Sequence, residues 1–117
     1  MDFYPTLLDL CGLPLKPEQH LDGKSLKKIL NGEEDSDVEA RFLGWSYPHN
    51  HGLGHKPSHA ILKGDWKFIR FDSDEPSELY NIAEDISETK NLATTHPEKL
   101  KELDLLMTEW LKETNAK

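Results

Sequence analysis

The sequence predicts an α+β fold in which a small antiparallel sheet of about four strands packs against a C-terminal helix. Short alternating apolar segments, separated by turn residues, occupy the middle of the chain, and a long stretch with helical periodicity follows them. A third observation adds short helices before the sheet, because apolar residues at helical spacing begin almost at the first residue.

The strand region occupies the centre of the sequence, and its predicted strands are residues 41–47, 59–63, 66–71 and 78–82. The dipeptide Gly64-Asp65 is a hairpin signal between the second and third strands. In the third strand the alternation of residue types is clear, so one face should carry Trp66, Phe68 and Arg70, and the other Lys67, Ile69 and Phe71.

The C-terminal helix is predicted to begin at Pro97, a residue suited to the first helical position, with Thr95 or His96 as its cap. Its apolar residues recur at helical spacing and form one stripe, which consists of Leu100, Leu103, Met107, Trp110 and Leu111. Such a stripe is typical of a helix that covers one face of a sheet, so we expect it to form the core.

The first part of the chain predicts a helix over residues 2–11, capped by Asp2 and ended by Gly12. A brief helix over 24–30 and a solvated acidic loop over 33–39 follow. We expect residues 1–32 to be a helical lead-in and residues 33–117 to be the α+β domain.

One face of the first helix is apolar and carries Phe3, Leu7, Leu8 and Cys11. This apolar face starts almost at the first residue of the sequence. We therefore expect it to pack on a part of a longer protein that this chain lacks. In this chain it should be exposed or paired with a second copy. Association or a disordered N-terminus would follow. Cys11 has no partner for an internal disulfide and is interpreted as a small buried hydrophobe.

The composition suits one compact domain, with 117 residues of which 36% are hydrophobic. The net charge of −8 argues against unassisted binding to nucleic acid or anionic membranes. The apolar runs are too short for a transmembrane span, and no signal peptide is visible after Met1.

Residues 45–59 read W-S-Y-P-H-N-H-G-L-G-H-K-P-S-H and hold four of the six histidines. The H-x3-H spacing, which occurs twice, would suit zinc or copper on a helix, because a helix places such histidines on one face. Gly52, Gly54 and Pro57 are incompatible with a helix here. No cysteine or acidic residue lies in the segment. A ligand-facing loop is therefore favoured, with a polar turn and a metal site as alternatives.

No catalytic residue is predicted. The sequence lacks a Gly-rich phosphate loop and the CxxC, HExxH and GxSxG motifs. Serines that lie near histidines or acids in the sequence do not define a triad, because a triad is a matter of three-dimensional geometry. The acidic pairs Asp72/Asp74 and Glu84/Asp85 are interpreted as turn and capping groups.

Several segments, taken in order, resemble the C-terminal region of arylsulfatase-type sulfatases. The most specific segments are G-D-W-K-F-I at 64–69 and E-L-Y-N-I-A-E-D-I-S-E-T-K-N-L-A at 78–93. They are preceded by D-F-Y-P-T-L-L-D-L-C-G-L, L-D-G-K-S-L and W-S-Y-P-H-N-H-G. The resemblance extends from Asp2 to about Trp110. It implies a small four-stranded antiparallel sheet with a C-terminal helix, in agreement with the prediction from periodicity.

The resemblance also implies that the chemistry lies elsewhere. Sulfatases of this family use a formylglycine made within a C/S-x-P-x-R motif, together with calcium, and both belong to a catalytic domain that this sequence lacks. Cys11 is followed by Gly-Leu-Pro-Leu and does not fit the motif. We therefore expect an inactive fragment with no cofactor of its own, whose partner is the missing catalytic domain. The full-length enzyme is expected to be exported.

By the same resemblance the 45–59 loop lines the substrate site. His49 matches the histidine of the family's Y-P-H segment and is the best candidate substrate contact, followed by His51, His55 and Lys56. Imidazole and ammonium groups suit a sulfated sugar or aryl sulfate. Two alternatives stay open, a stand-alone module that binds sulfated glycans and a metal protein that uses the histidine loop.

Within residues 78–93 the resemblance points to structural roles. Asp85, Glu88 and Asn91 are expected to form a turn that hydrogen-bonds its own backbone. The side chains of Trp66, Phe68, Leu79 and Tyr80 are expected to be buried between the sheet and the helix.

Overall fold

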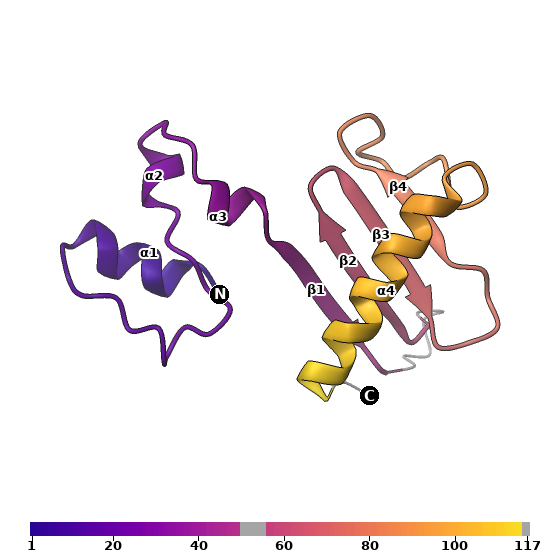
Figure 1. Ribbon diagram of the computed structural model, residues 1–117, viewed down its shortest axis with the longest axis horizontal. Helices are drawn as coiled ribbons and strands as arrows, with labels where there is room; N and C mark the ends of the chain where they lie inside the picture. The colour runs from indigo at the N-terminus through magenta and orange to yellow at the C-terminus, as the bar shows by residue number, and fades with distance from the viewer. Residues whose placement is uncertain (50–55, 116–117) are drawn as a thin grey trace. The chain divides into compact units, whose positions relative to one another are not determined.

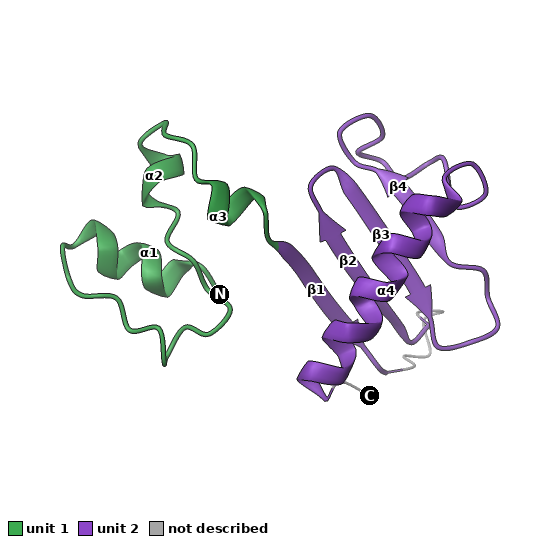
Figure 2. Cartoon of the chain, in the orientation of Figure 1, with its two compact units in different colours: residues 1–41 green, residues 42–117 purple. Residues whose placement is uncertain are grey.

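A computed structural model describes residues 1–49 and 56–115 of the chain. The chain divides into two compact units, residues 1–41 (unit 1) and residues 42–117 (unit 2) (Figure 2). In the described ranges no helix is both long enough and apolar enough to cross a membrane.

Unit 1 contains three short helices, α1 (Phe3–Leu10), α2 (Lys27–Leu30) and α3 (Ser36–Glu39) (Figure 1). Asp2 stands at the N-cap of α1, but its side chain makes no capping bond. Its carboxylate instead accepts hydrogen bonds from the two terminal guanidinium nitrogens of Arg41 and from the backbone N–H of Lys24. The hydrogen bond from Arg41 lowers the pKa of Asp2 to about 2. The predicted cap is therefore wrong, and Asp2 joins the two ends of unit 1.

Phe3, Leu7 and Cys11 of the predicted apolar face of α1 are exposed, and Leu8 is partly buried. The side chain of Phe3 is 81% exposed and that of Leu7 is 57% exposed. Cys11 is also exposed, so the interpretation of Cys11 as a buried residue is wrong. The thiol lies where α1 ends, because Gly12 adopts a φ of +68° and the N–H of Leu13 returns to the carbonyl of Leu8.

The acidic segment 33–39 is not wholly a loop, because residues Ser36–Glu39 form one helical turn. The carboxylate of Asp35 accepts a hydrogen bond from the N–H of Asp37 at 3.1 Å, which is the capping interaction that starts α3. Two further acidic residues stand in this first turn, where the helix dipole favours negative charge. Capping and dipole together offset the short length of the helix.

Unit 2 is a four-stranded antiparallel sheet in sequential order, β1-β2-β3-β4, covered by one helix (Figure 1). The strands are β1 (Phe42–Tyr47), β2 (Ser58–Lys63), β3 (Trp66–Phe71) and β4 (Glu78–Asn81), and α4 is Pro97–Thr114. Pro97 is in the first turn with His96 at the N-cap, which does not make a side-chain capping bond. The predicted α+β class and its four antiparallel strands are confirmed.

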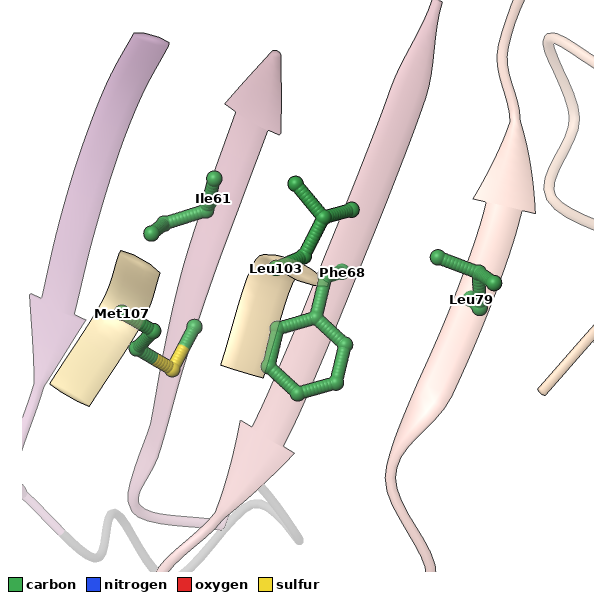
Figure 3. Close-up of a cluster of buried hydrophobic side chains, with 5 residues drawn as sticks. All are labelled: Ile61, Phe68, Leu79, Leu103 and Met107. Carbon is green, nitrogen blue, oxygen red and sulfur yellow. The ribbon is translucent and has the colours of Figure 1, made fainter. Parts of the chain in front are cut away.

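The core of unit 2 lies between the sheet and α4. Five side chains are fully buried there, and Figure 3 shows them meeting from β2, β3, β4 and the helix: Ile61, Phe68, Leu79, Leu103 and Met107. Arg70, on the same face as Phe68, donates to Asp104 at 2.8 Å and Thr108 at 3.0 Å of α4. Of the predicted apolar stripe of the C-terminal helix, Leu103 and Met107 are in the core, and Leu100 and Leu111 pack against it partly buried.

Tyr80 is buried at 8% exposure but does not lie between the sheet and the helix. It pairs with Lys67, whereas the adjacent Leu79 pairs with Phe68, and consecutive strand residues point to opposite faces. The expectation that both Leu79 and Tyr80 face the helix is therefore wrong. Burial of Tyr80 and its hydrogen bond to Glu78 raise its pKa to about 12.

The segment after β4 forms the expected self-bonded turn through Asp85 and Asn91, whereas the side chain of Glu88 accepts hydrogen bonds from Lys67 of β3 instead. The carboxylate of Asp85 accepts the N–H groups of Thr89 and Lys90, both at 2.8 Å, and these bonds lower its pKa. The side-chain oxygen of Asn91 accepts the N–H of Leu79 at 3.1 Å and that of Ala93. This turn therefore connects β4 to the segment that leads into α4.

Candidate functional site

The histidine-rich segment connects β1 to β2, and its two ends are held by the sheet. Tyr47, the last residue of β1, pairs with Ser58, the first residue of β2. Pro48, His49, Lys56 and Pro57 continue from these strand ends. The predicted contacts His51 and His55 lie outside the described residues, so His49 and Lys56 are the two candidates with a described position.

His49 lies two residues beyond the end of β1 and is exposed. Its imidazole ring stands edge-on to the ring of Tyr47, with the centroids 6.3 Å apart and an interplanar angle of 83°. Edge-to-face packing of this kind restricts an aromatic ring without removing it from solvent. The arrangement presents an oriented imidazole that can donate to, or accept from, a hydroxyl or sulfate group.

Lys56 lies before the start of β2 and forms an ion pair with Glu75, in the connection between β3 and β4. Both side chains are substantially exposed, at 52% and 40%. The positive charge of Lys56 is therefore balanced by a neighbouring carboxylate. An anionic ligand that used this ammonium group would have to share it with Glu75 or displace that carboxylate.

The end of the segment is held to the same β3–β4 connection by a second pair, which was not predicted from the sequence. The Nε2 atom of His59 lies 2.9 Å from a carboxylate oxygen of Asp72, and the side chain of His59 is 95% buried. The N–H of Asp72 donates to the carbonyl of Pro57 at 3.1 Å. Together with the Lys56–Glu75 pair, these contacts hold the return of the segment against one neighbouring loop.

A signal for this pair was present in the sequence. The two-residue turn at Gly64-Asp65 sets the register of β2 against β3, in which Ser58 pairs with Phe71. Continuing the same register by one residue places Pro57 opposite Asp72. Asp72 was predicted only as a turn residue, but counting back from the Gly64-Asp65 turn places it beside the histidine-rich segment.

His59 also carries an unexplained polar atom. Its Nδ1 is buried and has no hydrogen-bond partner within the described part of the chain. A buried imidazole that bonds Asp72 through Nε2 is a structural group rather than a surface ligand. Of the histidines in the 45–59 segment, His59 is thus directed into unit 2, whereas His49 is directed to solvent.

The described residues do not fit the cofactors that the family resemblance implies. Within residues 1–49 and 56–115 no group of three or more His, Cys, Asp or Glu side chains could hold a metal ion. Cys11 is exposed at the end of α1 and lacks the motif required for formylglycine formation. We assign no bond-breaking step to these residues.

Comparison with known proteins agrees with the fold and the sequence motifs. Residues 1–117 match the family model described as N-sulphoglucosamine sulphohydrolase, C-terminal. A sulfatase from Formosa agariphila is 32% identical over 99% of this chain, and arylsulfatase K from Danio rerio is 31% identical over 92%. The chain spans 23% and 20% of the length of these two relatives.

Two solved structures show the same arrangement. A putative sulfatase from Bacteroides thetaiotaomicron superposes with a TM-score of 0.79 over 98% of this chain and 25% of its own, and at 24% identity it shows the fold alone. A second structure, of a protein in complex with its substrate D-glucosamine-2-N,6-O-disulfate, is 30% identical with a TM-score of 0.68 over 95% of this chain and 23% of its own. The chain therefore belongs to the N-sulphoglucosamine sulphohydrolase C-terminal family, the C-terminal part of sulfatases.

Proposed function

We propose that this chain supports a sulfuric ester hydrolase, by stabilising its catalytic domain and by lining its substrate site through the segment between β1 and β2. The match of residues 1–117 to the sulfatase C-terminal family is the observation that supports this most strongly. The nucleophile and the calcium site would belong to the catalytic domain, so the chain alone would be inactive. Export of the full-length enzyme is part of the same proposal.

The substrate class is a sulfated sugar, in which His49 contacts a hydroxyl or sulfate group. The relative solved with D-glucosamine-2-N,6-O-disulfate supports this choice, since it is 30% identical to the chain. The exposed, oriented imidazole of His49 is chemically suited to such a group. Further proposed contacts are His51, His55 and Lys56. To bind the sulfate, the ammonium group of Lys56 would leave its ion pair with the carboxylate of Glu75.

The stabilising role is supported by unit 1, which buries little of its own surface. Its buried residues are Pro5, Thr6 and Gly23, whereas Phe3 and Leu7 are exposed. A unit of about 40 residues rarely holds together without help from a partner, metal or disulfide. We propose that the apolar face of α1 packs on the catalytic domain, and that the isolated chain can self-associate through it.

The test is steady-state kinetics of the full-length enzyme with a sulfated glucosamine substrate, comparing His49→Ala with His96→Ala. His96 is a matched control, because it is exposed and contacts an aromatic ring, Trp66, at the other end of the sheet. Loss of a ligand contact at His49 should raise KM about tenfold, the equivalent of about 1.4 kcal/mol, while His96→Ala leaves KM unchanged. An unaltered KM in His49→Ala would contradict the role of this residue.

Two measurements on the chain alone test the other parts of the proposal. Hydrolysis of an aryl sulfate by the 117-residue chain should be undetectable, and turnover would show that the nucleophile has been assigned to the wrong part. Calorimetric titration with the sulfated sugar should give no heat of binding. Micromolar binding would instead favour a stand-alone glycan-binding module, in spite of the net charge of −8.

A further inference from the structure

The connection between β3 and β4, residues 72–77, lies beside the return of the histidine-rich segment and contacts it in three ways. The N–H of Asp72 donates to the carbonyl of Pro57 at 3.1 Å, and the carboxylate of Asp72 hydrogen-bonds to the buried imidazole of His59. The third contact is the ion pair between Lys56 and Glu75. One loop therefore holds both the course of the returning chain and the cation on it.

Strand register explains why Glu75 reaches Lys56. Ser58, the first residue of β2, pairs with Phe71, the last residue of β3. In an antiparallel pair, the residues that precede Ser58 continue beside those that follow Phe71. Lys56 precedes Ser58 by two residues and Glu75 follows Phe71 by four, so the two side chains project from neighbouring strand ends. The position of the ion pair is therefore set by the sheet of unit 2.

Negative charge predominates among the described groups at this end of the sheet. The β3–β4 connection contributes three carboxylates, those of Asp72, Asp74 and Glu75. Within the described residues 56–59 and 70–77 the only Lys or Arg side chains are Lys56 and Arg70, and the guanidinium of Arg70 hydrogen-bonds to α4. A polyanionic ligand gains affinity from an excess of positive charge, and these residues offer a deficit.

The ion pair between Lys56 and Glu75 determines how much positive charge remains for a ligand. The two side chains are 52% and 40% exposed, so water screens the pair and its partners can separate. A sulfate that takes the ammonium group still has to compete with a carboxylate that the loop holds beside it. If His49 binds a first sulfate, as proposed above, a second sulfate at this end meets a cation that is already neutralised.

We propose that Glu75 is a specificity-determining residue of the sulfatase, which withholds Lys56 from the substrate and so favours a sugar with one sulfate over a sugar with two. This inference rests on the proposed function and deepens it, because a sulfated sugar is named there without its degree of sulfation. Glu75 acts through Lys56 and takes no part in bond breaking. Its effect should therefore appear in affinity and not in kcat.

The experiment compares Glu75→Gln with Asp74→Asn in the full-length enzyme. Asp74 is a matched control, because it is exposed, adjacent in the chain and equally charged, and it forms no ion pair within the described residues. Hydrolysis of an aryl sulfate is followed while glucosamine 6-sulfate or D-glucosamine-2-N,6-O-disulfate is added as a competitive inhibitor. Glu75→Gln should lower the Ki of the disulfated sugar about fivefold, and that of the monosulfated sugar less than about twofold.

Further readouts connect this change to the ion pair. The kcat of Glu75→Gln should equal that of the wild type, and Asp74→Asn should change both Ki values by less than about twofold. The gain in Glu75→Gln should shrink when sodium chloride is raised from roughly 0.05 to 0.5 M, because salt screens exposed charges. In a Lys56→Gln background, Glu75→Gln should leave the ratio of the two Ki values unchanged, since no ammonium group remains to be released.

An unchanged Ki ratio in Glu75→Gln would overturn the proposal, as would equal changes in Glu75→Gln and Asp74→Asn. Weaker binding in Glu75→Gln would show that Glu75 orients Lys56 for the substrate, which contradicts the proposal. Persistence of the gain in the Lys56→Gln background also contradicts it, because Glu75 would then repel the ligand directly. Failure of the proposed function would be visible in the wild type alone, as absence of aryl sulfate turnover or of inhibition by either sugar.

Discussion

Adding a methyl group at Gly44 should destabilise unit 2, although alanine is the better strand former. Gly44 lies in β1 on the face covered by α4, opposite the fully buried Ile61 of β2. A Cβ atom at this position would stand 2.7 Å from Cε2 and 2.8 Å from Cζ2 of the Trp110 indole. A rigid ring cannot yield by bending, so either Trp110 or the strand has to move.

The expected magnitude follows from two opposing effects. Replacing glycine by alanine stabilises a protein by about 0.4–1 kcal/mol where the backbone tolerates it, because the unfolded chain loses freedom. Forcing an extra carbon into a packed contact costs about 1–3 kcal/mol. Because the ring must retreat by about 0.7 Å or more to reach ordinary contact distance, the cost should dominate. We expect a net loss of about 1–2 kcal/mol, or roughly 5–10 °C in Tm for a unit of this size.

The assay is urea unfolding followed by far-ultraviolet circular dichroism, which does not depend on the fluorescence of Trp110. Four proteins are compared: the wild type, Gly44→Ala, Trp110→Ala and the double variant. If the indole causes the loss, Gly44→Ala should be neutral or stabilising once Trp110 is removed, with a coupling free energy of about 1–3 kcal/mol. Equal losses in both backgrounds, or no loss with Trp110 present, would refute the reasoning.

Three further predictions concern single groups of unit 2. Ultraviolet titration should show Tyr80 ionising near pH 12. Because the folded state favours the neutral phenol, the free energy of unfolding that is present below pH 10 should decrease as the pH rises through 12. The variant Tyr80→Phe should abolish this decrease. Asp72→Ala should cost about 1–2 kcal/mol in urea unfolding, because the buried imidazole of His59 loses its only partner among the described residues. Asp85→Ala should accelerate hydrogen exchange of the Thr89 amide, which now donates to that carboxylate; unchanged exchange would show that the turn does not depend on it.

The sheet and α4 could be predicted because their signals are local and repeated. The alternation in residues 66–71, the Gly64-Asp65 turn and the helical stripe from Leu100 to Leu111 each contain several residues that agree. The one-turn helix α3 was missed because its formation depends on a single capping carboxylate, that of Asp35. Four residues without apolar periodicity give no pattern that would distinguish such a turn from a loop.

The candidate site was predictable in position but not in its contacts. The sequence placed His49 immediately after a strand, and the structure confirms that position. The pairing of Lys56 with Glu75 joins two loops that are separated by two strands, and loop conformation sets the distance between them. No local pattern encodes such a contact, whereas the opposition of Pro57 and Asp72 follows from strand register and could have been derived.

The two faces of the unit 2 sheet differ in how completely their side chains are buried. In unit 2 the face towards α4 is complete, with Ile61, Phe68 and Leu79 fully buried, so the sheet needs no partner to define its strands. The other face leaves Trp45 half exposed and ends at Tyr47, against which His49 rests. Substitutions on the helix side of β1 should therefore change the core of unit 2, whereas substitutions at Tyr47 should change the position of the His49 ring.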